Sequence, residues 1–249
     1  MRRLIVLLLL LVLPGIACSF DVQMQPQSEE QTVIPSLSPI PVTEADFLGN
    51  AQVLEGPNIN YNNIRFTLDP ALGSRLYVFD DVTTIDGLTA HHTRFALNPE
   101  EYCQTWCLIV YPVAEFEQAF GTFVFPPAGY RGGAGVVFKT QEMALSFQDS
   151  SGDRGLETFG QNHYGVSNES LKYVFRGYSV DKQYGIYVQV PARAASLPDV
   201  APTMTTDAED ILEYNRRVAE SMNGLTPADF TPNLSLLDAL VASIRVETP

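Results

Sequence analysis

The segment LKYVFRGYSVDKQYGIYVQVP, residues 171–191, decides the fold. Apolar side chains recur at every second position in both halves: Leu171, Tyr173 and Phe175, then Tyr184, Ile186, Val188 and Val190. The positions between them are mostly polar or small: Lys172, Val174 and Arg176, then Gln183, Gly185, Tyr187 and Gln189. A period of two predicts an antiparallel hairpin with one solvent-exposed face. Asp181 and Lys182 lie near its turn, and Pro191 ends it.

Two helical patterns follow the hairpin. The first has a capping box at Thr206 and Glu209, ends at Gly224, and carries an apolar face of Ala208, Ile211, Leu212, Val218, Ala219 and Met222. The second begins with Thr231 as N-cap and Pro232 in the first helical position. Its apolar stripe consists of Leu234, Leu237, Leu240, Val241 and Ile244. We expect Leu237, Leu240, Val241 and Ile244 to pack on the hairpin, and Leu236 to lie off the stripe.

Shorter strand patterns precede the hairpin, at 64–68, 76–82, 94–97 and 143–147. Residues 107–113 are continuously apolar, which is typical of a central strand covered on both faces, and 114–120 fit a short helix. Strands followed by C-terminal helices predict an α+β fold: a mainly antiparallel sheet with the C-terminal helices packed on one face. We expect residues 47–249 to form this single domain, which is long enough for a sizeable core.

The N-terminus has the pattern of an export signal. Arg2 and Arg3 precede an apolar run at 4–13, which is too short to span a bilayer. This predicts a signal peptide at 1–17. The sequence Gly15-Ile16-Ala17-Cys18 resembles the lipobox of bacterial lipoproteins, although the lipobox usually has Leu where Gly15 stands. The resemblance implies that Cys18 becomes the lipidated N-terminus, with acyl chains such as palmitate, on the outer face of a bacterial membrane. Plain secretion and an uncleaved anchor are the alternatives.

Residues 18–46 read as the lipidated cysteine followed by a disordered tether. Four prolines and four glutamines fall between residues 19 and 46, with no helical or strand period. Such a composition buries too little apolar surface to fold. We expect it to hold the folded domain away from the membrane.

The remaining two cysteines are Cys103 and Cys107. In an exported protein an odd cysteine count needs an explanation, and lipidation of Cys18 leaves these two to form a disulfide. The alternative is two reduced, partly buried thiols. A zinc site is not expected, because Cys-x₃-Cys has no second ligand pair in the sequence.

Charge and motifs exclude several classes of function. With 15 Lys and Arg against 29 Asp and Glu, the chain has a net charge of −14, which argues against nucleic-acid binding and against docking on anionic lipid. Serine-hydrolase, P-loop and dinucleotide motifs are absent from the sequence, so no cofactor is expected. His91 and His92 point to opposite sides if extended, and we expect a solvated loop rather than a metal site. Residues 149–153 predict a polar turn rather than a calcium loop.

Five tyrosines are the remaining candidates for a binding face: Tyr130, Tyr164, Tyr178, Tyr184 and Tyr187. Exposed tyrosine is frequent at binding surfaces. The alternative for these residues is packing in the core and across strands.

Three stretches, 167–177, 183–191 and 231–244, resemble a group of uncharacterised exported bacterial lipoproteins. The closing helix with residues 243–246 also resembles the end of the PsbP/Mog1-like fold. Neither resemblance implies an activity. The leading hypothesis is therefore a tethered domain that binds or scaffolds an envelope protein or glycan. The alternative is an extracytoplasmic hydrolase whose site does not show as a motif.

Overall fold

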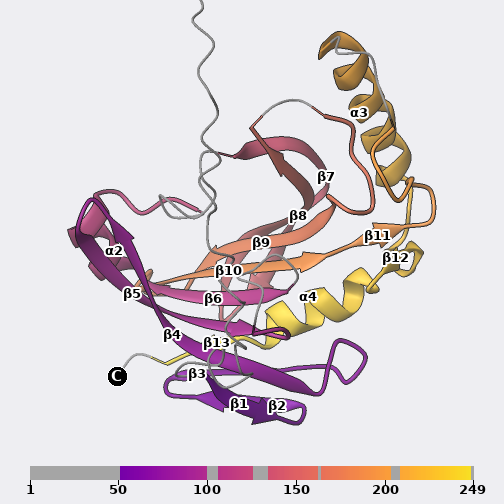
Figure 1. Cartoon of the computed structure of the whole chain (residues 1–249). Coiled ribbons are helices and arrows are strands. Elements are labelled where there is room, and N and C mark those ends of the chain that lie inside the picture. Colours follow the sequence, from indigo (N-terminus) through magenta and orange to yellow (C-terminus); the bar gives the residue numbers. More distant parts are fainter. Residues whose placement is uncertain (1–50, 100–105, 126–133, 162–163, 203–207, 248–249) are drawn as a thin grey trace, which may run out of the picture. The chain divides into compact units, whose positions relative to one another are not determined.

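Eight strands form one antiparallel sheet (Figure 1): β1 (Gln52–Glu55), β4 (Arg75–Ile85), β5 (Leu88–Ala96), β6 (Cys107–Pro112), β7 (Gly135–Phe147), β8 (Ser150–Gly160), β9 (Lys172–Tyr178) and β10 (Tyr184–Pro191). Their order across the sheet is β1–β4–β5–β6–β10–β9–β8–β7. The computed structural model describes residues 51–99, 106–125, 134–161, 164–202 and 208–247. All of these belong to one compact unit, 42–249.

The described part of the chain also contains three α-helices, a short 3₁₀ helix and two small sheets. The α-helices are α2 (Val113–Phe120), α3 (Ala208–Asn223) and α4 (Leu234–Ser243), and the 3₁₀ helix η1 is Pro227–Asp229. One small sheet joins β2 (Asn58–Tyr61), β3 (Ile64–Thr67) and β13 (Arg245–Val246), and the other joins β11 (Arg193–Ala194) and β12 (Phe230–Thr231). The predicted α+β class, a mostly antiparallel sheet with two helices near the C-terminus, is confirmed.

The prediction for the central strand is also confirmed. β6 lies between β5 and β10, and all its residues from Cys107 to Tyr111 are buried. The hairpin at 171–191 forms β9 and β10, with Val188 paired to Phe175. These strands reach the middle of the sheet because every position in β6, and most in β10, can lose water without leaving a charge unpaired.

The solvent-exposed face expected for the hairpin is wrong. Val174, Tyr187 and Gln189, on its more polar side, are all buried. Tyr187 donates a hydrogen bond from its hydroxyl to Gln189 Oε1 at 2.9 Å, so these two polar side chains satisfy each other inside the protein. Alternation in the sequence indicated the two sides correctly, but not that both are covered.

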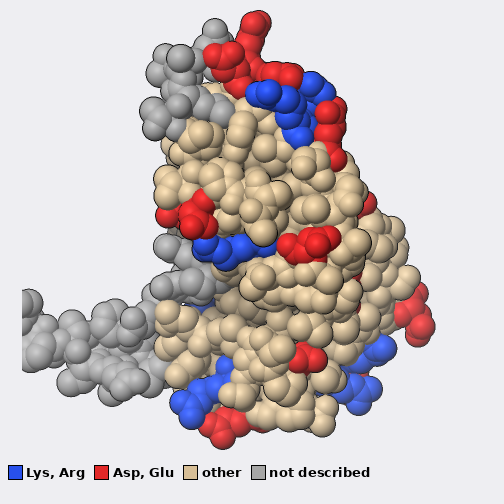
Figure 2. Space-filling view, turned by 90° about the vertical axis from the view of Figure 1, so that its right-hand side faces the viewer, with Lys and Arg blue, Asp and Glu red and all other residues tan. Residues whose placement is uncertain are grey.

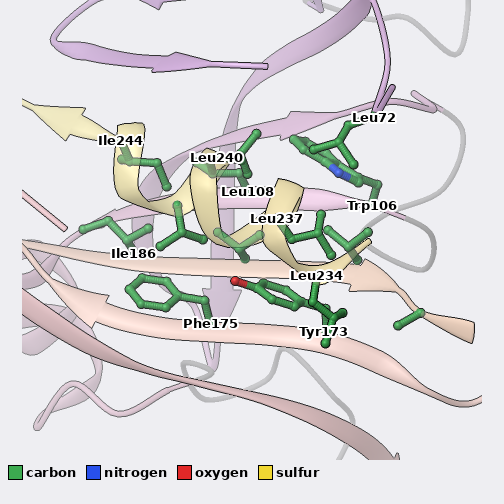
Figure 3. Packing of buried hydrophobic residues seen from close by; sticks show 14 of the residues in the cluster. Leu72, Trp106, Leu108, Tyr173, Phe175, Ile186, Leu234, Leu237, Leu240 and Ile244 are labelled. Carbon is green, nitrogen blue, oxygen red and sulfur yellow. The ribbon is translucent and has the colours of Figure 1, made fainter. Parts of the chain in front are cut away.

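α4 covers one face of the sheet, as its apolar stripe predicts (Figure 3). The expected residues of the stripe are buried: Leu234, Leu237, Leu240, Val241 and Ile244. They belong to one hydrophobic cluster with residues of the hairpin, including Tyr173, Phe175, Ile186 and Val188. The prediction that the last helix packs on the 171–190 hairpin is confirmed.

A buried ion pair fixes α4 to the sheet within this layer. Arg154 of β8 donates to both carboxylate oxygens of Asp238, from Nε at 3.0 Å and Nη2 at 2.9 Å. Its Nη1 donates to the Gln141 carbonyl at 2.7 Å. Tyr173 donates its hydroxyl to Asp238 at 2.9 Å, and burial together with the Asp238 charge raises the Tyr173 pKa, so the phenol keeps its proton.

A second, aromatic cluster covers the opposite face beside α2. Phe116 from α2 and Phe123 from the segment after it pack against Tyr111, with ring centroids 5.0 and 5.7 Å from that of Tyr111. Tyr187 of β10 belongs to the same cluster. The sheet is therefore a middle layer, with the C-terminal helices contributing to one core and α2 to the other.

The helix ends differ in part from the expected ones. The N-cap of α4 is Asn233, whose side chain accepts a hydrogen bond from the Ser235 N–H at 2.9 Å, while Thr231 lies in β12. Asparagine caps at least as well as threonine, so the cap shifts to the residue next to the helix. α3 ends at Asn223, before Gly224 as predicted. The proposed cap Thr206 lies outside the described residues.

α3 is more exposed than its predicted apolar face suggests. Met222 is fully buried and Ile211 nearly so, but Leu212 is 48% exposed. Figure 2 shows charged side chains gathered over this helix at the top of the view. Two of them, Arg216 and Glu213, form an exposed ion pair of 2.8 Å. None of the described helices is long and apolar enough to cross a membrane.

Candidate functional site

The predicted tyrosine face is not assembled as one surface. Tyr187 is fully buried in the α2-side cluster, and Tyr178 packs against that cluster. Tyr184 packs on the other core and accepts a hydrogen bond from Asn63. Tyr164 donates its hydroxyl to the Phe159 carbonyl, and Tyr130 lies outside the described residues. The alternative, tyrosines used for packing, holds for the four described ones.

The two histidines lie in β5, so the expectation of a solvated loop is wrong. His91 projects to the surface, where Glu115 of α2 contacts both its backbone N–H and its Nδ1, at 2.7 and 2.6 Å. These contacts lower the pKa of Glu115 despite an opposing effect of burial. His92 is buried and stacks on Tyr111, with ring centroids 5.2 Å apart. The opposite orientation of the two rings follows from their adjacency in a strand.

His92 belongs to a small charged group on the α2 side of the sheet. Its Nε2 lies 3.8 Å from Asp81, which accepts a hydrogen bond from Arg94 Nε at 2.5 Å. The Arg94 guanidinium also lies over the Phe79 ring, 4.0 Å from its centroid. Burial lowers the pKa of His92 to about 4, with smaller effects from Asp81, Arg94, His91 and Glu115. At neutral pH His92 is therefore an uncharged packing residue beside a paired aspartate.

This arrangement predicts a pH-dependent loss of stability. An unfolded histidine takes up a proton near pH 6.5, whereas folded His92 does so near 4, so stability falls as the pH drops through this window. Between pH 7 and pH 5 the free energy of unfolding should fall by about 2 kcal/mol on account of His92. Urea unfolding at both pH values should show a clearly smaller fall for His92→Gln. His91→Gln, which leaves His92 in place, should keep the wild-type fall, and an unchanged fall in His92→Gln would refute the assignment.

A second charged pair lies further along the same face. Arg176 donates from Nη1 and Nη2 to the two carboxylate oxygens of Glu157, at 2.6 and 2.7 Å. Glu157 is 1% exposed. Arg176 is the cross-strand neighbour of Tyr187, and its guanidinium lies 5.8 Å from the centre of that ring. The geometry is that of a structural bidentate pair, with both carboxylate oxygens occupied.

The candidate metal and cysteine sites gain little from the structure. No group of three or more metal-ligating side chains occurs in the described ranges. The polar turn expected at 149–153 is shorter, because Gln148 and Asp149 turn the chain with positive φ and β8 already begins at Ser150. Cys107 is buried at the start of β6. Cys18 and Cys103 lie outside the described residues, so lipidation and the Cys103–Cys107 bridge stay predictions.

Two polar hollows have their charged groups already engaged. The larger, of about 590 Å³, contains Arg193 and Asp199, which form an ion pair with each other. Asn168, which also lines it, donates to the Leu197 carbonyl at 2.9 Å. The smaller, of about 240 Å³, contains Arg65, which pairs with Glu247 at 2.8 Å, and Arg245, which donates to the carbonyls of residues 242 and 244.

A third pocket, of about 380 Å³, differs in being apolar. Seven of its eight described lining residues are apolar, the exception being Asn98. Leu72, Trp106 and Val190 line it and also belong to the core under α4, so the pocket continues that core towards the surface. Figure 3 shows Leu72 and Trp106 together, beside the end of α4 that carries Leu234. Its size and lining are those of pockets that hold small molecules, and we define it as the Trp106 pocket.

Sequence reasoning did not single out Trp106. It is the only tryptophan of the chain and directly precedes the strand that was predicted to be central. The indole is 3% exposed, and its Nε1 has no hydrogen-bond partner among the described residues. A lone tryptophan at the entry of a buried strand was the available signal, but its partners Leu72 and Pro232 are distant in sequence.

Comparison with models of protein families, with curated proteins and with solved structures finds no match in any of the three.

Proposed function

We propose that this protein is an exported lipoprotein, anchored to the outer face of a bacterial membrane through Cys18, whose folded domain is a binding module. The observation that carries the binding role is the Trp106 pocket, an apolar hollow that continues the core and is large enough for a small molecule. The anchoring is supported by the signal sequence that ends at Cys18 and by the proline- and glutamine-rich segment after it.

A binding role is favoured over hydrolysis by the state of the ionisable groups on the sheet. The buried arginines Arg94, Arg154 and Arg176 are each paired with a carboxylate, at distances between 2.5 and 2.9 Å. Such pairs hold strands and helices in register, and their oxygens are occupied by the partner. An envelope protein or a glycan, contacted elsewhere on the surface, is a further partner that a tethered domain of this kind could scaffold.

The anchoring is tested by Cys18→Ser. In a bacterial host that processes lipoproteins, the wild-type chain should sediment with the membranes and Cys18→Ser should move to the soluble exported fraction, because no acyl chains can attach. Mass spectrometry of the N-terminal peptide should show the acyl groups on the wild-type chain alone. Membrane retention of Cys18→Ser equal to that of the wild type would contradict the lipid anchor.

A further inference from the structure

We infer that the Trp106 pocket binds an uncharged, mainly aliphatic molecule that carries a carbonyl oxygen, the chemistry of a fatty-acid ester. The inference rests on the proposed function in one respect, that the domain is a binding module. It goes further by assigning the ligand's charge, its apolar body and the group that recognises it.

The lining of the pocket sets the charge of the ligand. None of the eight described residues around it is ionisable, so a charged ligand would lose its hydration and gain no counter-ion. The rest of the chain sharpens this selection, because a protein with a net charge of −14 repels anions over its whole surface. Fatty acids, which are ionised at neutral pH, are therefore disfavoured against their esters.

The body of the ligand follows from the continuity with the core. Leu72, Leu97 and Val190 form aliphatic walls, and Pro191 and Pro232 present further apolar surface. An alkyl chain placed there removes apolar surface of both partners from water, as a core side chain would. A sugar would bring several hydroxyl groups to walls that offer them few partners.

Trp106 provides the recognition of the carbonyl. Its indole N–H is a donor only, it is buried, and it lacks a partner among the described residues. Buried donors in proteins are almost always satisfied. A ligand with an acceptor oxygen next to an alkyl body would satisfy this donor and fill the apolar space together.

The test uses the whole chain carrying Cys18→Ser, so that no detergent is needed. Methyl octanoate and sodium octanoate are compared by displacement of the neutral fluorescent dye 1-aminoanthracene, and Trp106 emission, the only tryptophan signal of the chain, is followed in parallel. We expect methyl octanoate to displace the dye and shift the Trp106 emission, with an affinity at least about 10-fold higher than that of octanoate, because the anion must be desolvated.

Two variants locate the site and the contact. Ala71→Phe fills the pocket from its exposed rim and should abolish binding, whereas Ala195→Phe, the same change at the rim of the larger polar hollow, should leave it intact. Trp106→Phe keeps an aromatic ring but removes the donor, and should weaken methyl octanoate roughly 3- to 10-fold in the dye assay. Thermal melting establishes that each variant is folded.

The outcomes separate this inference from the proposed anchoring. Equal affinity for ester and anion, undiminished binding in folded Ala71→Phe, or an unchanged affinity in Trp106→Phe would each overturn the assignment of the ligand. Absence of any binding by the folded wild-type domain would overturn it as well. None of these results bears on the membrane fractionation of Cys18→Ser, which tests the anchor by itself.

Discussion

Replacing Asp238 by alanine should lower the free energy of unfolding by about 3–5 kcal/mol, the largest effect of any single substitution considered. Arg154 is 3% exposed and depends on both oxygens of Asp238, so the variant leaves a buried guanidinium without its counter-charge. The hydroxyl of Tyr173 loses its acceptor at the same time. Since domains of this size are stable by about 5–15 kcal/mol, urea unfolding should show the loss clearly.

The chain offers a matched control for this variant. Arg216 and Glu213 on α3 lie 2.8 Å apart, close to the 2.9 Å of the Arg154–Asp238 pair, but both side chains are about half exposed. Glu213→Ala should leave the unfolding curve nearly unchanged, because water replaces the lost partner. The double variant Arg154→Met with Asp238→Leu should recover much of the loss, since no buried charge remains. An Asp238→Ala protein as stable as the wild type would refute the role given to the pair.

The second large effect is expected for Leu240→Ala, at about 2–5 kcal/mol. Leu240 lies between α4 and the sheet in the main core, where the backbone on either side cannot close over a cavity. For a domain of this length such a loss lowers the melting temperature by roughly 5–20 °C. Circular dichroism melting of the variant and the wild type under identical conditions measures it.

Two leucines provide the comparison. Leu236, on the same helix but only partly buried, should lose less on replacement by alanine, and Leu212 of α3, which is 48% exposed, should lose least. Deletion of residues 19–46 should leave the melting temperature nearly unchanged, because a tether contributes no core. A Leu240→Ala protein that melts like Leu212→Ala would contradict the packing of α4 on the sheet.

The hairpin at 171–191 and the run at 107–112 show how far patterning extends. Their periodicity predicted strands, and the unbroken apolar run predicted a strand covered on both faces, which β6 is. The same reasoning failed for the second face of the hairpin. Tyr187 and Gln189 look like surface residues in the sequence, and they are buried because each is the hydrogen-bond partner of the other.

The candidate site shows the same division. Exposed tyrosines were the reasonable expectation from composition, yet the four described ones serve packing or hydrogen bonding within the fold. The Trp106 pocket draws residues from four separate stretches, near 71, 97, 190 and 232, as well as Trp106 itself. A pocket assembled from such distant stretches leaves no spacing for a motif to report.

The sequence by itself determined the local choices: which segments are strands, that 234–243 is a helix with one apolar stripe, and that the chain begins with an export signal. These follow from periodicity and composition within a few residues, where steric and solvation preferences act directly. Only the tertiary structure decided which faces lose water, where Arg154 finds Asp238, and that an apolar hollow stays open beside Trp106. Those outcomes depend on contacts between residues far apart in the chain, whose charges and shapes must fit together before burial becomes favourable.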